Sequence, residues 1–342
     1  MTETDGDEIR TANTLRERVG LGRFYSWFLL GGNRFVVTGL LAAAVFATFV
    51  GISTLVVPSL QVAIRSADTI ETMFSTMIGT VITGTTLVVT ISQLVISQEN
   101  GPLGDQRQRM SDAMDFRTYA TELFETAPEA EPAGFLAQLL EANVRRADAL
   151  EECIADNGND ELRRQVGEFL DSLRANADVV LDELDGEQFG TFAVLDAILD
   201  YNYAWKIYQV ERFTDTFGDS LDDEEREAFH RLETALTMFG PAREQIKTLY
   251  FQWELVDLSR YILYAAVPAL VVAGAMLAFV GAPTFPGVTL GVPNITWVVG
   301  AAFTVTLVPF LLFLTYILRI VVVAKHTLAI GPFVLRQSYG GD

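Results

Sequence analysis

Four long apolar stretches dominate the pattern of hydrophobic and polar positions along the chain. Each has about the 20 residues that a helix needs to cross the hydrocarbon core of a bilayer. The first has an apolar body without a charged side chain, and the fourth is interrupted only by Arg319 near its end. The pattern therefore predicts four transmembrane helices, at Phe35–Leu60, Met73–Ser97, Tyr261–Gly281 and Trp297–Val323.

The chain between the second and third apolar stretches follows a different pattern. Its apolar positions recur every three to four residues, which is typical of amphipathic helices packed on a core. An aromatic-rich run, Phe189–Phe217, predicts a buried helix or a subunit interface. Gly240-Pro241 would begin a last helix, which has no breaker before Tyr264 and would run into the third span. Other breakers delimit helices near 106–126, 133–155, 160–184, 188–217 and 222–239.

These elements predict an all-α, polytopic membrane protein with a helical domain inserted between its second and third spans. Near the start of the chain, Leu15–Leu30 mixes arginines with aromatic residues, which predicts an interfacial amphipathic helix. The expected segments are an N-terminal segment 1–34, spans one and two within 35–98, the helical domain 99–259, spans three and four within 260–325, and a C-terminal tail 326–342.

Basic residues are distributed unevenly around the spans, and this asymmetry predicts the orientation of the protein. Five arginines precede the first span, whereas only Arg65 lies between spans one and two. The segment 282–296 between spans three and four has no charge. We therefore expect a multi-pass protein of the cell membrane whose termini and central domain are cytoplasmic. Further basic residues near the membrane, in the central domain and after the fourth span, support the same orientation. They are Arg107, Arg109, Lys247, Arg260, Lys325 and Arg336.

The excess of negative charge is confined to the central domain. The chain has 342 residues and a formal net charge of -20, yet residues 99–259 alone hold 36 acidic and 14 basic side chains. Such an acidic surface argues against nucleic-acid binding, which needs a basic footprint. Only three of the 24 basic residues are lysines. Acid excess with few lysines is typical of halophilic archaea, where molar salt screens charge over about 3 Å; an acidic mesophilic domain is the alternative.

The sequence has no recognisable catalytic motif. Cys153 is the single cysteine, and the two histidines, His230 and His326, are far apart. There is no Ser-His-Asp spacing, glycine-rich phosphate loop, HExxH or CxxC motif. We therefore expect neither an enzyme nor a protein that carries a metal or another cofactor.

Polar and small side chains recur at intervals of seven in the second span. Such a repeat suits a left-handed helix bundle. In one interpretation the residues form a tight helix seam, because small residues allow close approach and threonine hydroxyls bond the backbone one turn back. In the other they line a pore, where their dipoles partly solvate a permeating ion. The two series are Thr69, Thr76, Thr83, Thr90 and Ser97, and Thr72, Gly79, Thr86 and Gln93.

Charged and amide side chains follow this span at its expected cytoplasmic end. They would meet an ion that enters or leaves a pore, and so predict a cytoplasmic mouth. The alternative is a helix terminator followed by an ion-paired surface turn. The residues are Gln98, Glu99, Asp105, Arg107 and Arg109.

The end of the second span also carries a resemblance. The run Thr85–Glu99, TTLVVTISQLVISQE, with Gly101–Arg107 after it, resembles a group of uncharacterised haloarchaeal membrane proteins. It is also similar to a wider family of predicted prokaryotic membrane proteins of unknown function, and implies no activity. The plan of four spans, cytoplasmic termini and a helical domain between spans two and three resembles bestrophin-type anion channels. That resemblance implies a pentamer whose second span lines the pore.

Two functional hypotheses remain open. The leading one is a homo-oligomeric ion channel or channel-like protein, with the second span around the axis; its partners would be the lipid bilayer, further copies of itself and inorganic ions. The alternative is a non-conducting membrane scaffold or sensor, whose acidic domain binds a soluble partner and whose continuous helix relays its state. A hydrated axial path would favour the channel, and a seam sealed by side chains would favour the scaffold.

Overall fold

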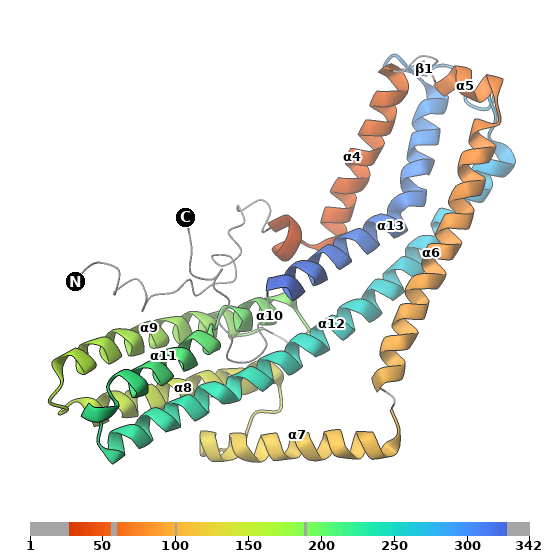
Figure 1. Cartoon of the computed structure of the whole chain (residues 1–342). Helices are drawn as coiled ribbons and strands as arrows, with labels where there is room; N and C mark the ends of the chain where they lie inside the picture. Colours follow the sequence, from red (N-terminus) through yellow and green to blue (C-terminus); the bar gives the residue numbers. More distant parts are fainter. Residues whose placement is uncertain (1–26, 56–59, 100, 188–189, 327–342) are drawn as a thin grey trace. The chain divides into compact units, whose positions relative to one another are not determined.

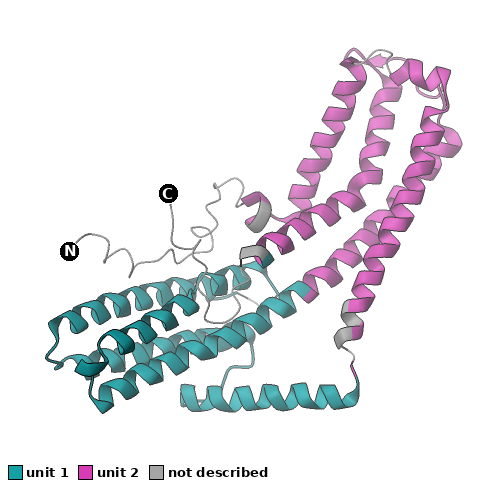
Figure 2. Ribbon diagram, in the orientation of Figure 1, with its two compact units in different colours: residues 1–22, 102–251, 324–342 teal, residues 23–101, 252–323 magenta. Residues whose placement is uncertain are grey.

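The computed structural model describes residues 27–55, 60–99, 101–187 and 190–326. The chain divides into two compact units, shown in Figure 2: unit 1 comprises residues 1–22, 102–251 and 324–342, and unit 2 comprises residues 23–101 and 252–323. The predicted all-α class is confirmed, because 85% of the residues that the structure describes are helical.

Unit 2 contains the membrane helices. As predicted, four helices of the described chain are long and apolar enough to cross a membrane, which indicates a membrane-embedded protein. Within the described residues α4 extends to Leu55, and a short helix, α5 (Leu60–Ser66), comes before α6; residues 56–59 of the predicted first span lie outside the described residues. The four helices are α4 (Arg34–Leu55), α6 (Thr69–Glu99), α12 (Asp223–Phe279) and α13 (Asn294–His326), and Figure 1 labels them.

Two short irregular elements complete unit 2. A β-ribbon between α12 and α13 pairs β1 (Val288–Thr289) with β2 (Val292–Pro293) in antiparallel register. Leu290 and Gly291 between the strands both have positive φ, as a two-residue hairpin turn requires. A π-helix, η1 (Trp27–Gly31), precedes α4. Most of the predicted interfacial helix Leu15–Leu30 lies outside the described residues, as does the tail after His326.

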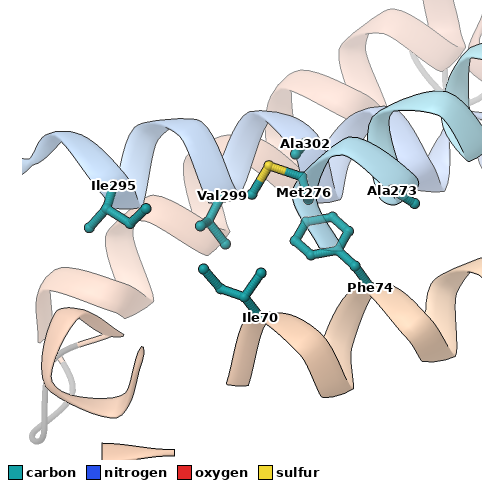
Figure 3. Close-up of a cluster of buried hydrophobic side chains, with 7 residues drawn as sticks. All are labelled: Ile70, Phe74, Ala273, Met276, Ile295, Val299 and Ala302. Carbon is teal, nitrogen blue, oxygen red and sulfur yellow. The ribbon is translucent and has the colours of Figure 1, made fainter. Parts of the chain in front are cut away.

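In the described part of unit 2, two apolar clusters involve α6, α12 and α13. In the first, Phe74 of α6 is fully buried against Met276 of α12 and Val299 of α13 (Figure 3). In the second, Val88 of α6 packs with Ile262 of α12 and Leu312 of α13. These clusters hold one side of α6 against its two neighbours and so determine which of its faces remains uncovered.

Unit 1 is a bundle of amphipathic helices. In α9, apolar side chains recur every three to four residues and are buried, which agrees with the expected helix at 160–184. Asn159 caps this helix, because its side-chain oxygen accepts hydrogen bonds from the backbone N–H groups of Glu161 and Leu162. The helices are α7 (Leu103–Phe124), α8 (Pro132–Ile154), α9 (Asp160–Leu184), α10 (Phe192–Leu199), α11 (Tyr203–Thr216), the 3-10 turn η2 (Gly218–Ser220) and the part of α12 up to Phe251.

The expected single helix at 188–217 is wrong. It is two helices, α10 and α11, with a break at Asp200–Asn202. A tertiary contact holds this break open, because the Asn176 side chain of α9 donates a hydrogen bond of 3.1 Å to the backbone oxygen of Asp200. The aromatic-rich run contributes to the core of unit 1 within a single chain, because Tyr201, Tyr203 and Phe213 are all buried.

The expected helix boundary at Gly240-Pro241 is also wrong, because α12 continues through both residues. Packing against another helix explains the glycine. A Cβ on Gly240 would lie 3.0 Å from the Tyr203 ring, so the ring occupies the space that any side chain would take. Gly240 therefore serves close packing in unit 1. The predicted continuity of the helix from Ala242 to Tyr264 is confirmed.

A buried polar cluster lies at the centre of unit 1. Lys206 is 3% exposed; its ammonium group donates to Asn176 Oδ1 at 2.6 Å and lies 4.4 Å from the centre of the Tyr201 ring. The Tyr201 hydroxyl accepts a hydrogen bond from Asn143 Nδ2, and burial raises the pKa of this phenol. Partners on α8, α9 and α11 thus compensate for the loss of water around these groups.

Candidate functional site on helix α6

One face of α6 packs inside unit 2, and the predicted polar series lies on the opposite face. The buried stripe is Ile70, Phe74, Val81, Val88 and Ser92. At about 100° per residue, the mean direction of this stripe and that of the nine predicted residues differ by about 180°. Thr69 is half-buried, and the rest of the series is exposed: Thr72, Thr76, Gly79, Thr83, Thr86, Thr90, Gln93 and Ser97.

The hydroxyl groups of this polar face bond mainly to their own helix. The hydroxyls of Thr76, Thr86 and Thr90 donate to the backbone oxygen four residues earlier, at 2.8 to 2.9 Å. Ser97 donates to the oxygen three residues earlier, and Thr69 donates to Ala63 of α5. Such local bonds satisfy the hydroxyl donor while leaving oxygen lone pairs directed outward.

The same face carries no formal charge along most of its length. From Thr72 to Gln98, α6 has no ionisable side chain; Glu71 and Glu99 lie at the two ends. Its chemistry is therefore that of neutral dipoles, which can replace part of an ion's hydration shell or bond another helix. Beside it, Ile82 and Thr86 line a shallow apolar groove with Leu263 and Val267 of α12.

The predicted cytoplasmic mouth divides between the two units. Gln98 and Glu99 belong to the last turn of α6 in unit 2. Asp105, Arg107 and Arg109 lie on α7 in unit 1, where all three are exposed. A common mouth formed by these five residues stays a prediction.

Sequence reasoning missed a polar contact on the buried side of α6. The Ser92 hydroxyl forms a hydrogen bond with the Ser259 hydroxyl of α12, and it also approaches the backbone oxygen of Leu255 at 3.4 Å. The sequence could have predicted this contact, because Ser92 is a polar residue on the apolar stripe of α6 and does not belong to the series spaced by seven. A hydroxyl at such a position in a membrane helix indicates a partner on a neighbouring helix.

Two buried arginines were also missed as structural groups. Arg34, one of the five arginines before the first predicted span, and Arg319, near the end of the fourth, are each 6% exposed. Arg34 Nη1 donates to the backbone oxygen of Thr315 on α13 at 3.3 Å, and Arg319 Nη2 donates to the backbone oxygen of Gly32 at 2.8 Å. The Thr38 and Thr315 hydroxyls are 3.2 Å apart. The two guanidinium groups thereby tie α4 and α13 together at one end of unit 2.

A family model described as "Family of unknown function (DUF7972)" matches residues 1–342. The chain belongs to this family. The description of DUF7972 attaches no activity, in agreement with the expected resemblance to uncharacterised proteins. The haloarchaeal and bestrophin-type resemblances stay predictions. No curated protein matches the chain, and no solved structure matches it. In the described part of this DUF7972 protein, no three His, Cys, Asp or Glu side chains form a group that could hold a metal ion.

Proposed function

We propose that this DUF7972 protein is a homo-oligomeric ion channel or channel-like membrane protein, with α6 around the axis of the assembly. The observation that carries the proposal is the direction of the polar face of α6, opposite the stripe that packs on α12 and α13. Polar side chains at membrane depth normally face protein or water. Several copies arranged with these faces inward would enclose a path lined by oxygen atoms.

The proposed orientation places unit 1 and both termini in the cytoplasm. Its basis is the excess of bases before α4 and near the ends of α6 and α13, in contrast with the uncharged segment between α12 and α13. In this arrangement ions would pass from the end of α6 at Glu99 to a strongly acidic cytoplasmic domain. The resemblance to bestrophin-type channels makes a pentamer the first stoichiometry to test.

Recording from purified protein in planar bilayers tests the proposal. We expect single-channel currents from the unmodified protein. Thr83→Ile in the middle of the polar face should reduce the unitary conductance several-fold, and Thr83→Ser should restore most of it. The matched control is Ile91→Val, because Ile91 is exposed on α6 about 100° away from the centre of the polar face. Inserted oligomer without conductance across salts and voltages would refute the channel.

A non-conducting scaffold or sensor is the second candidate, and one observation favours it. The hydroxyls of Thr76, Thr86 and Thr90 already bond to their own helix, so a sealed helix–helix seam would leave none of these donors unpaired. In this case the face of α6 would join copies without a hydrated path, and the acidic domain would bind a soluble partner. An oligomer of defined size that excludes ions at every voltage would favour this candidate.

A further inference from the structure

The first half of α7 is exposed along its whole length. Every residue from Pro102 to Asp115 is exposed. The second half is anchored: Phe124 packs on Phe135 of α8 with ring centres 5.5 Å apart, and Arg117 Nη2 donates to the backbone oxygen of Pro128 at 2.6 Å. An unpacked half-helix that is continuous with an anchored one needs another surface to stabilise it, since isolated helices of this length are marginal in water.

The exposed half of α7 separates apolar from acidic residues. At about 100° per residue, Leu103, Met110 and Met114 fall within about 40° of one another, and Arg107 lies at their edge. The acidic residues Asp105, Asp112 and Asp115 lie around the opposite side, centred about 170° away. Leu103 and Met110 are 82% and 65% exposed, so this face is uncovered within the chain.

The apolar face is not an extension of the surface that packs on α8. In the second half of α7, the packed residues Phe116, Ala120 and Phe124 point about 100° away from the direction of the Leu–Met face. The Leu–Met face, defined by Leu103, Met110 and Met114, is therefore a separate surface. Folding of unit 1 does not account for it.

The position of α7 in the chain limits what this face can reach. The membrane helix α6 ends at Glu99 and α7 begins at Leu103, so the connection spans at most about 14 Å. The first turns of α7 are thus tethered to the bilayer surface by a short piece of chain. A lipid surface is present at that end of α6 in a single chain as well as in an assembly, whereas a soluble partner would have to be recruited.

We propose that the first half of α7 binds the bilayer surface, with the Leu–Met face at the boundary between acyl chains and headgroups. Arg107 extends its guanidinium group to lipid phosphates, as basic side chains beside an apolar face do. Asp105, Asp112 and Asp115 remain in water on the other side. This interaction goes beyond the proposed function, because it holds whether or not α6 lines a conducting path.

Fluorophores on the two faces of α7 test this proposal in the full-length protein reconstituted in phospholipid vesicles. With Cys153→Ser as background, single cysteines at Met110 and Met114 report the Leu–Met face, and one at Asp112 reports the acidic face. A cysteine at Val179, which is exposed on α9, is the control for water. Each cysteine is labelled with bimane, and quenching is compared between brominated lipids and aqueous iodide.

The proposal predicts that lipid quenching is several-fold stronger at positions 110 and 114 than at 112 and 179, with iodide quenching in the reverse order. Equal iodide quenching at 110 and 112 would overturn it, because both faces would then be in water. Position 110 could instead be protected from both quenchers. If a nitroxide at this position also showed spin–spin broadening, a second copy of the chain would lie against the Leu–Met face, and the proposal would be overturned. None of these results depends on conductance.

Discussion

The buried polar cluster of unit 1 and the polar face of α6 in unit 2 differ in the partners of their hydrogen bonds. In unit 1, Lys206 and Asn176 are buried, and their hydrogen bonds join different helices. On α6 of unit 2, hydroxyls such as those of Thr86 and Thr90 are exposed and bond within their own helix. The buried groups of unit 1 stabilise the fold of a single chain. The exposed hydroxyls of α6 leave a polar surface that water or another protein chain can contact. Changes in unit 1 should therefore affect folding, and changes on the polar face of α6 should affect assembly or conduction.

The largest effect on stability is expected at Asn176. Asn176→Ala removes the acceptor of the Lys206 ammonium group and the donor to the Asp200 oxygen, and leaves both in a buried site. We expect a loss of about 3 to 5 kcal/mol, because two buried groups, one of them charged, each lose a hydrogen bond. Thermal unfolding followed by circular dichroism measures it.

A double variant sharpens this prediction. Adding Lys206→Met to Asn176→Ala removes the buried charge that lost this hydrogen bond, so part of the lost stability should return. If the double variant is as unstable as the sum of the two single variants, Asn176 and Lys206 do not interact energetically. The contrast between the two units would then lose its clearest example.

The second largest effect is expected on the buried face of α6. Phe74 is fully buried between α12 and α13, so Phe74→Ala should leave a cavity and cost about 3 kcal/mol. Leu87→Ala is the matched control on the same helix, because Leu87 is 61% exposed. Equal losses of thermal stability for the two variants would show that the two faces of α6 are not distinct.

An intermediate effect, dependent on pH, is expected in unit 1. Burial disfavours the charged form of Glu244, but hydrogen bonds from Lys247 and Arg243 outweigh it and lower the pKa of this carboxyl group. A lowered pKa in the folded state stabilises the protein above the unfolded pKa, and this contribution disappears as pH falls through the folded pKa. Glu244→Gln should therefore lower the melting temperature at pH 7 and have little effect near pH 3; an effect that grows toward low pH would contradict this sign.

The smallest effect on stability is expected for hydroxyls of the polar face. Thr76→Val keeps the shape of the side chain and removes a hydrogen bond that α6 makes to its own backbone. Because the site is exposed within the chain, we expect a change below about 1 kcal/mol in the thermal stability of the dissociated chain. Cross-linking and sedimentation then report whether the same variant weakens self-association; a large loss of stability in the dissociated chain would place Thr76 in the core.

Much of the fold could be predicted from local sequence, and the failures have a common cause. The apolar length of the four membrane helices and the periodicity of α9 are encoded within each segment. The break at Asp200 depends on Asn176, which is 24 residues away, and the continuation through Gly240 depends on the Tyr203 ring. The roles of Arg34 and Arg319 depend on partners nearly the whole chain apart. Local pattern carries no information on such contacts.

The candidate site shows the same division. The seven-residue spacing predicts that the oxygen-bearing residues of α6 share a face, and the geometry of the helix then follows. Which way that face points is fixed by Phe74 and Val88, which pack on two helices more than 160 residues later in the chain. What covers the face is determined by other molecules, which one chain does not contain.

The reactivity of single cysteines along α6 shows whether water reaches its polar face. In a Cys153→Ser background, single cysteines at each position from Ile82 to Gln93 are exposed in proteoliposomes to a water-soluble methanethiosulfonate reagent. A hydrated path along α6 predicts fast reaction at Thr83, Thr86 and Thr90 and protection at Val88. Cysteines on the polar face that react only with a lipid-soluble reagent, or with neither reagent, would contradict a hydrated path along α6.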